Sequence, residues 1–148
     1  MKVSNKTWLR EFTPIEEMEA GVVLSGSETK SAYEGRIKLE ASFVKIREHE
    51  PFLINTEIFK YKFDGSLEYN PTRSRKLLLN KKEILRLESK MASNPGLTIV
   101  PVSMYTSGRR IKVKIALVKG KKETEKRRLE KGKEILRDQQ REVKKFSR

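Results

Sequence analysis

The segment LTIVPVSMYTSGRRIKVKIALV, residues 97–118, decides the fold because it contains the clearest strand pattern of the chain. In its second half, apolar side chains occupy every second position: Ile111, Val113, Ile115 and Leu117. Lys112 and Lys114 alternate with them and face the opposite side, as the period of a β-strand requires. The first half is also apolar, and the intervening Ser107-Gly108 is typical of a tight turn. The segment therefore predicts an antiparallel hairpin.

Further strands are predicted nearer the N-terminus. Between residues 15 and 24, the alternate apolar positions are Met18, Ala20, Val22 and Leu24. Residues 37–46 alternate as well, with a change of phase before Val44 that a β-bulge would produce. Residues 48–51 then read as a turn with His49 on its surface, and apolar alternation resumes. The resumed positions are Phe52, Ile54, Thr56 and Ile58.

Two helices and one long loop complete the prediction. A short helix is expected over residues 27–34, capped by Ser27 and ended by Gly35. Residues 60–70 lack sustained periodicity and indicate a long loop, a kind of segment that is often functional. Asn80 and Glu83 resemble a capping box at the start of a longer helix. The apolar face of that helix, which ends at residues 94–96, contains Ile84, Leu87 and Met91.

These elements predict a mainly β protein with short helices. Several short antiparallel strands joined by tight turns favour an OB-like β-barrel with flanking helices, because closing a sheet removes its exposed edges. We expect residues 1–118 to form this barrel. Residues 119–148 would be a separate basic C-terminal tail.

The charge is concentrated in that tail. The chain has 34 Lys and Arg against 20 Asp and Glu, a net charge of +14, and residues 119–148 hold 13 of the basic side chains but 6 of the acidic ones. Such a segment gains most from meeting a polyanion, so nucleic acid is the first partner to consider. The tail is expected to be disordered when free and helical when bound. The alternative is a solvated tail that only aids solubility.

Composition also excludes several function classes. The chain has no cysteine and a single histidine, which removes thiolate catalysis and the common zinc sites. There is no phosphate-binding P-loop and no nucleophile paired with a histidine base, so we expect neither an enzyme nor a cofactor. No apolar run is long enough for a signal peptide or a membrane helix, which favours a cytoplasmic protein. Nothing in the sequence indicates self-association, and we expect a monomer.

Five collinear blocks resemble one bacterial family, the SsrA-binding protein SmpB. The resemblance runs from about residue 17 to residue 127, and its blocks are residues 19–31 with Gly35-Arg36, residues 70–79, residues 96–101, residues 111–116 and residues 119–122. It implies an OB-like barrel that binds the tRNA-like domain of tmRNA and carries it to stalled ribosomes. It further implies that the basic tail enters the vacant message channel beside the small-subunit rRNA and becomes helical there.

The candidate RNA-binding residues come from both lines of reasoning. Arg73, Arg75 and Lys76 stand between the long loop and the capped helix, where basic side chains can reach phosphates, although a solvated junction would look the same. The resemblance implies RNA contacts for Glu19, Leu78 and Lys112, to which we add the outward-facing Lys114. In the tail, the candidates are Lys121, Lys122, Lys126 and Arg127.

Three features leave alternatives open. Pattern alone allows Leu77, Leu78 and Leu79 to be partly buried together, and Glu28 is expected to pair with Lys30 rather than to contact RNA. Thr124 stands where the family often has histidine, which removes one stacking contact. The alternative interpretation is a general OB-like RNA-binding or ribosome-associated basic protein without selectivity for tmRNA.

Overall fold

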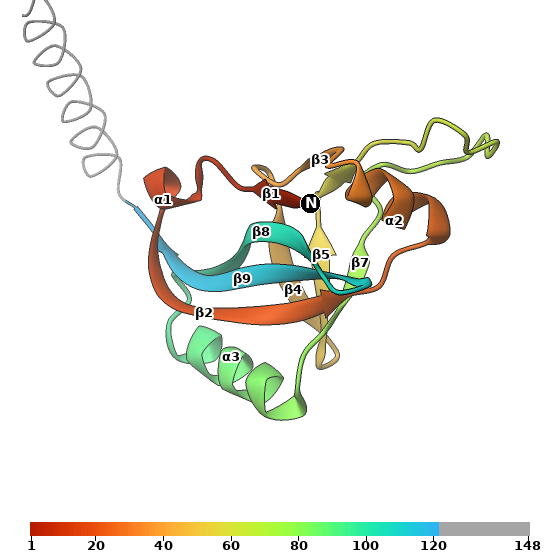
Figure 1. The fold of residues 1–148 in the computed structure, drawn as a ribbon. Helices are drawn as coiled ribbons and strands as arrows, with labels where there is room; N and C mark the ends of the chain where they lie inside the picture. The colour runs from red at the N-terminus through yellow and green to blue at the C-terminus, as the bar shows by residue number, and fades with distance from the viewer. Residues whose placement is uncertain (122–148) are drawn as a thin grey trace, which may run out of the picture.

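Nine strands and three helices make up residues 1–121, the part of the chain that the computed structural model describes (Figure 1). The strands are β1 (Lys2–Ser4), β2 (Phe12–Val22), β3 (Ile37–Lys38), β4 (Phe43–Arg47), β5 (Glu50–Ile54), β6 (Glu57–Ile58), β7 (Arg75–Leu78), β8 (Leu97–Ser107) and β9 (Arg110–Gly120). The helices are α1 (Trp8–Glu11), α2 (Gly26–Tyr33) and α3 (Lys81–Ser93).

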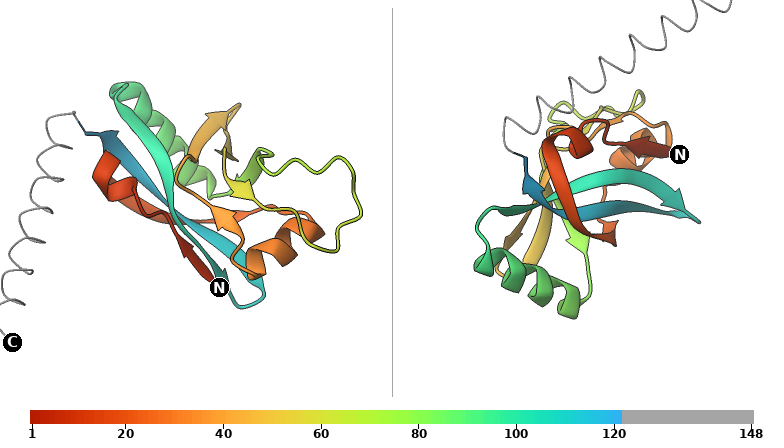
Figure 2. Two further views of the ribbon diagram at one scale, coloured as in Figure 1. Left: turned by 90° about the horizontal axis from the view of Figure 1, so that it is seen from above. Right: turned by 90° about the vertical axis from the view of Figure 1, so that its left-hand side faces the viewer.

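Six of the strands close into a ring. The sheet order is β1-β8-β4-β5-β7-β2-β9, and an additional pairing of β8 with β9 joins the last strand to the second. All of these pairings are antiparallel, and β1 adds to β8 outside the ring. The helices lie around the outside of the curled sheet (Figures 1 and 2). The predicted antiparallel OB-like barrel with flanking helices is confirmed.

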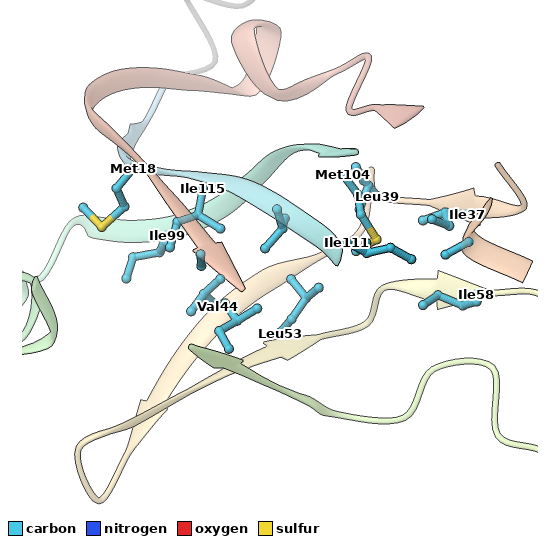
Figure 3. Close-up of a cluster of buried hydrophobic side chains, with 14 of the residues drawn as sticks. Met18, Ile37, Leu39, Val44, Leu53, Ile58, Ile99, Met104, Ile111 and Ile115 are labelled. Atoms are coloured by element: carbon cyan, nitrogen blue, oxygen red, sulfur yellow. The ribbon is translucent and has the colours of Figure 1, made fainter. Parts of the chain in front are cut away.

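The hairpin of β8 and β9 supplies much of the core, as the sequence predicts. Val113, Ile115 and Leu117 are fully buried and point into the barrel together with Ile99 of β8. Figure 3 shows Ile99 and Ile115 meeting Val44 and Leu53 from the opposite strands. The turn is made by Gly108, whose positive φ of 63° favours glycine. The register shifts between Pro101 and Ser103, which is consistent with a proline that has no N–H for the ladder.

Several predicted boundaries are wrong. Ser25 caps α2, not Ser27, because the Ser25 hydroxyl accepts the amide of Glu28 while the Glu28 carboxylate accepts the amide of Ser25. Residues 37–46 form two strands separated by a turn, not one strand with a bulge. The turn after β4 contains only Glu48 and His49, both with positive φ, and His49 is exposed as expected.

The predicted phase of β5 is also wrong. Leu53 is fully buried, and its neighbours Phe52 and Ile54 are only half-buried. The strand ends at Ile54, and the next residue, Asn55, has a positive φ of 62°. The buried Thr56 and Ile58 lie beyond this break, and Ile58 belongs to the separate short strand β6. Alternation across such a break cannot be extended from one strand to the next.

The segment after the long loop is a strand, where the sequence suggested a junction leading into a helix. Within β7, Arg75 and Leu77 are buried while Lys76 and Leu78 are exposed. This strict alternation resolves the question of the three leucines, because strand geometry sends neighbours to opposite faces. The helix that follows, α3, begins after Asn80 and buries Leu87, as predicted.

The N-terminal residues are more ordered than the sequence suggested. Trp8 of α1 is buried against Val100, Ala116 and Val118 on the outer side of the β8–β9 hairpin. The strand β9 runs to Gly120, and the amide of Lys121 donates to the carbonyl of Glu11 at 2.9 Å. The predicted division after Val118 therefore falls inside a strand. The expected tail comprises residues 119–148, of which residues 122–148 lie outside the described residues.

Among residues 1–121, no helix is both long and apolar enough to cross a membrane.

Candidate nucleic-acid interface

An open cleft of about 980 Å³ lies where the ends of β2, β7 and the β8–β9 hairpin meet the start of α3. Its walls come from six separate elements, so only the folded barrel creates it. The residues that matter below are Glu19, Gly21, Thr29, Glu50, Lys76, Leu78, Arg109, Arg110 and Lys112. Four of the predicted RNA-binding residues line this cleft: Glu19, Lys76, Leu78 and Lys112.

Leu78 is an apolar surface in the cleft. It points outward from β7 and keeps 55% of its surface exposed. It stands directly opposite Gly21 of β2, where an added Cβ would lie 3.3 Å from the Leu78 Cβ. The glycine therefore lets β2 approach the base of the Leu78 side chain. An exposed leucine at a fixed position on a strand can contact the apolar face of a base or sugar.

Glu19 is held by two donors on the barrel surface. The Lys112 ammonium lies 2.9 Å from Glu19 Oε1, and the Tyr105 hydroxyl donates to Glu19 Oε2. The hydrogen bond from Tyr105, followed by that from Lys112, lowers the pKa of Glu19. Partial burial and the same hydrogen bond raise the pKa of Tyr105 to about 12. Glu19 is therefore an ionised acceptor with fixed orientation near neutral pH.

A second ion pair follows Glu19 on the same face of β2, where Lys114 of β9 pairs with Glu17 at 2.9 Å. Glu16, which alternates with Glu17 along the strand, lies 2.6 Å from Lys90 of α3. The hydrogen bond from Lys90 is the largest influence on Glu16 and lowers its pKa. Lys114 thus lies two residues along β9 from Lys112, beside the cleft and not among its lining residues.

Further basic side chains line the cleft on both sides of β2. Lys76, exposed on β7, lies 3.3 Å from the carboxylate of Glu50 in an exposed pair. Arg109 and Arg110 line the cleft from the tip of the β8–β9 hairpin. Exposed pairs of this kind contribute little to stability, so Lys76 can leave Glu50 for a phosphate at low cost.

Arg73 and Arg75 occupy a different position, beneath the loop. The Arg75 side chain is fully buried and donates to Glu28 Oε2 at 2.6 Å and to the carbonyls of Thr56 and Pro71. Arg73 is about half-exposed, and its guanidinium lies 2.5 Å from Glu28 Oε1. The sequence prediction of an exposed basic run therefore does not describe Arg75, whose side chain joins α2, β7 and both ends of the loop.

The carboxylate of Glu28 is the centre of this buried cluster. Burial alone would raise its pKa, but the hydrogen bonds from Arg73 and the Ser25 amide, with the charge of Arg75, lower it to about 2. The predicted Glu28–Lys30 pair is wrong. The Lys30 ammonium instead lies 5.4 Å from the centroid of the Tyr61 ring.

Lys121 lies at the far end of β9 from the cleft. Its ammonium donates to the carbonyl of Leu9 at 2.7 Å. Lys122, Lys126 and Arg127 lie outside the described residues. The structure therefore brings together Glu19, Lys76, Leu78 and Lys112, places Lys114 beside them, buries Arg75 and leaves Arg73 half-exposed outside the cleft.

Two functional positions escaped the sequence prediction, Gly21 and Tyr105. Tyr105 is at an outward position next to the buried Met104, and it faces β9 residue Lys112 in the hairpin register. The predicted hairpin places Tyr105 on a strand, but only the fold brings Glu19 of β2 within reach of its hydroxyl. Within residues 1–121, no three His, Cys, Asp or Glu side chains gather in a way that could hold a metal ion.

The closed antiparallel ring and its charged outer face define an OB-like barrel, a class of protein that commonly binds oligonucleotides on one face. The cleft offers an apolar contact, a fixed carboxylate acceptor and mobile cations. That combination can contact bases or riboses as well as phosphates.

Comparison with known proteins identifies the family. The family model described as "SmpB protein" matches residues 2–145, and the chain belongs to this family. The SsrA-binding protein of Sulfurihydrogenibium sp. (strain YO3AOP1) is 46% identical over 135 residues, which cover 91% of this chain and 88% of the relative. The SsrA-binding protein of Enterococcus hirae is 44% identical over 144 residues, which cover 97% and 93%.

A solved structure is also similar. It is described as "tmRNA-SmpB: a journey to the center of the bacterial ribosome" and has a TM-score of 0.68 at 35% sequence identity. The match covers 82% of this chain and 85% of that chain.

Proposed function

We propose that this protein binds tmRNA and brings it to stalled ribosomes in trans-translation. The observation that carries the proposal is the near-full-length similarity to proteins named for binding SsrA, together with the cleft that gathers Glu19, Leu78 and Lys112. In this proposal the protein acts on the ribosome and therefore in the cytoplasm. It acts by binding RNA and not as an enzyme.

Within the cleft, each side chain has a distinct role in holding the tRNA-like domain. Lys76 and Lys112 exchange their carboxylate partners for phosphates. Glu19, still oriented by Tyr105, then accepts from a 2′-hydroxyl or a base donor, which a phosphate-binding surface alone could not recognise. Leu78 packs against an exposed base or ribose. Lys114 adds a further phosphate contact beside the cleft.

The buried arginine cluster supports this surface from below. Arg75 is enclosed by Glu28 and two backbone carbonyls, so its role is to fix β7, the strand that presents Lys76 and Leu78. Arg73 is exposed enough to add a phosphate contact while one of its nitrogens remains on Glu28.

The tail would serve the ribosome, not the tRNA-like domain. In this proposal Lys122, Lys126 and Arg127 contact small-subunit rRNA in the vacant message channel, and Lys121 marks the point where the tail leaves the barrel. A chain cut after Lys121 is expected to bind tmRNA almost as tightly as the full chain but to support no tagging of stalled products. Tagging by the cut chain would refute this division.

Selectivity for one RNA separates the proposal from a general RNA-binding protein. Glu19→Ala and Leu78→Ala should each weaken binding to the tRNA-like domain about tenfold and leave binding to an unrelated structured RNA nearly unchanged. Filter binding of both RNAs to purified variants measures this. Equal losses on the two RNAs would favour the general binder.

A further inference from the structure

A cluster of aromatic rings and cations lies apart from the cleft, on the long loop that follows β6. The loop projects beside α2 and away from the barrel (Figures 1 and 2). Lys30 of α2 and Lys62 of the loop lie 5.4 and 5.5 Å from the ring centroids of Tyr61 and Phe63. At the base of the loop, Arg36 and Lys38 approach the Phe59 ring at 5.9 and 5.8 Å.

These contacts lie close together. Four cation–π pairs fall on three rings of a single loop. Tyr61 and Phe63 also meet edge to face at 5.6 Å, so their rings form one continuous surface.

The fold does not need these rings for its core. Phe63 is 75% exposed, and the half-buried Tyr61 has its ring in contact with Phe63 and beneath the Lys30 ammonium. The loop beneath them is nevertheless held in place. Lys60 donates to the carbonyl of Ser66 at 2.5 Å, and the Tyr69 hydroxyl donates to the carbonyl of Ile58 at 2.6 Å. A fixed loop that displays exposed aromatic faces presents a binding surface.

The chemistry of this surface fits unpaired RNA. Aromatic faces that alternate with cations bind single strands, because each ring can stack on a base while the neighbouring cation takes the adjoining phosphate. Bases within a duplex are already stacked and cannot reach the rings. Four cations approach the rings, namely Lys30, Arg36, Lys38 and Lys62. The acidic residues nearest to them in the sequence are Glu28, Glu34, Glu40 and Asp64, and Glu28 is buried and already paired with Arg73 and Arg75.

The position of the cluster agrees with that partner. Thr29 lines the cleft, and the next residue, Lys30, lies over Tyr61. A single RNA can therefore occupy the cleft and pass over α2 to the loop. We propose that Tyr61 and Phe63, with their flanking lysines, form a second RNA contact that stacks one or two unpaired bases. The proposal shares with the function above only the premise that the partner is RNA.

The test uses the full chain and a fluorescent uridine 12-mer, which has no stable pairing. Affinity is measured by anisotropy at about 0.2 M salt, where binding by phosphate contacts alone is weak. Tyr61→Ala and Phe63→Ala should each weaken binding about tenfold, whereas Phe63→Tyr should retain it. Leu67→Ala is the matched control, because Leu67 is 99% exposed on the same loop but is not aromatic.

Ultraviolet cross-linking locates the contact independently. Adducts between uridine and Tyr61 or Phe63 are expected, and they should disappear when unlabelled 12-mer competes but persist when duplex RNA competes. Unchanged affinity in the double variant Tyr61→Ala/Phe63→Ala, with an unchanged thermal unfolding midpoint, would overturn the proposal. Equal competition by duplex RNA would also overturn it, because the surface would then recognise phosphates only.

The two proposals fail separately. Leu78→Ala should weaken binding of the tRNA-like domain about tenfold and leave binding of the 12-mer unchanged, since Leu78 lies in the cleft. If Leu78→Ala keeps the tRNA-like domain while Phe63→Ala loses the 12-mer, the proposed function fails and the second contact stands.

Discussion

Two glutamates at opposite ends of the exposure range show how one residue type serves structure and recognition. Glu28 is 1% exposed and neutralises Arg75, which has no exposed surface. Glu19 is exposed and bound by Lys112 and Tyr105, so in the proposed function it could exchange these partners for RNA. Removing one partner of a buried ion pair leaves the other charge unpaired in the interior. We therefore expect replacement of Glu28, but not of Glu19, to lower the free energy of unfolding greatly.

Replacing Glu28 tests this difference. Glu28→Gln leaves Arg75 buried without a counter-charge and should lower the free energy of unfolding by about 3–5 kcal/mol. Glu50→Gln, which loses only the exposed pair with Lys76, should change it by less than about 1 kcal/mol. Urea unfolding followed by far-ultraviolet circular dichroism measures both values. Similar losses in the two variants would contradict the role of Glu28.

The dependence of stability on pH should show the contribution of the Glu28 carboxylate. The pKa of Glu28 is about 2 in the folded chain against an ordinary value of 4.5, so the unfolded chain takes up this proton first as the pH falls. Its stabilisation is complete above about pH 4.5 and is lost progressively down to about pH 2. Glu28→Gln should show a shallower loss of stability across this window than the unmodified chain. Parallel curves would contradict the lowered pKa.

Tyr105 offers a test of Glu19 as an oriented acceptor. Tyr105→Phe removes one donor, so the pKa of Glu19 should rise toward its ordinary value and affinity for the tRNA-like domain should fall about fivefold. Binding to an unrelated structured RNA of equal length serves as the control and should not change. An unaltered affinity for the tRNA-like domain would show that the carboxylate needs no positioning.

Among the elements, the hairpin of β8 and β9 was predictable because Ile111, Val113, Ile115 and Leu117 alternate strictly and a glycine turn precedes them. The error in β5 and the missed strand β7 have a common cause. Both strands have five residues or fewer and end at sharp changes of direction, so period-two alternation is too short to define them. The sequence pattern could not predict the contact between Glu19 and Tyr105, because these residues are 86 positions apart and only the folded sheet brings them together.

The contribution of the β8–β9 hairpin to the stability of the fold can be measured. Ile115→Ala removes a fully buried side chain from β9 and should lower the free energy of unfolding by about 2–5 kcal/mol. Ile15→Ala is the matched control because Ile15 is 50% exposed on β2, and its effect should stay below about 1 kcal/mol. Chemical denaturation of both variants gives the comparison. Equal losses would contradict the assignment of β9 to the core.

At the scale of the whole molecule, positive charge is distributed between a folded barrel and the basic C-terminal segment. The barrel adds what charge alone cannot supply, namely the carboxylate of Glu19 and the apolar contact of Leu78 in one cleft. In the proposed function, phosphate contacts by the lysines would provide affinity, and the cleft would provide selectivity.

Salt dependence separates these two contributions. Lys112→Gln should reduce the slope of log affinity against log salt for the tRNA-like domain by about one, the share of one phosphate contact. Lys45, exposed on β4 and outside the cleft lining, provides the control Lys45→Gln, whose slope should equal that of the unmodified chain. Equal slopes for the unmodified chain, Lys112→Gln and Lys45→Gln would show that Lys112 makes no phosphate contact with the RNA.

The most direct test of the central claim is to purify the full chain from its own cells and sequence the RNA that accompanies it. The account predicts one dominant structured RNA with a tRNA-like domain, and a loss of that RNA from preparations of Leu78→Ala. A sample that reflects the general RNA content of the cell, unchanged by Leu78→Ala, would contradict it.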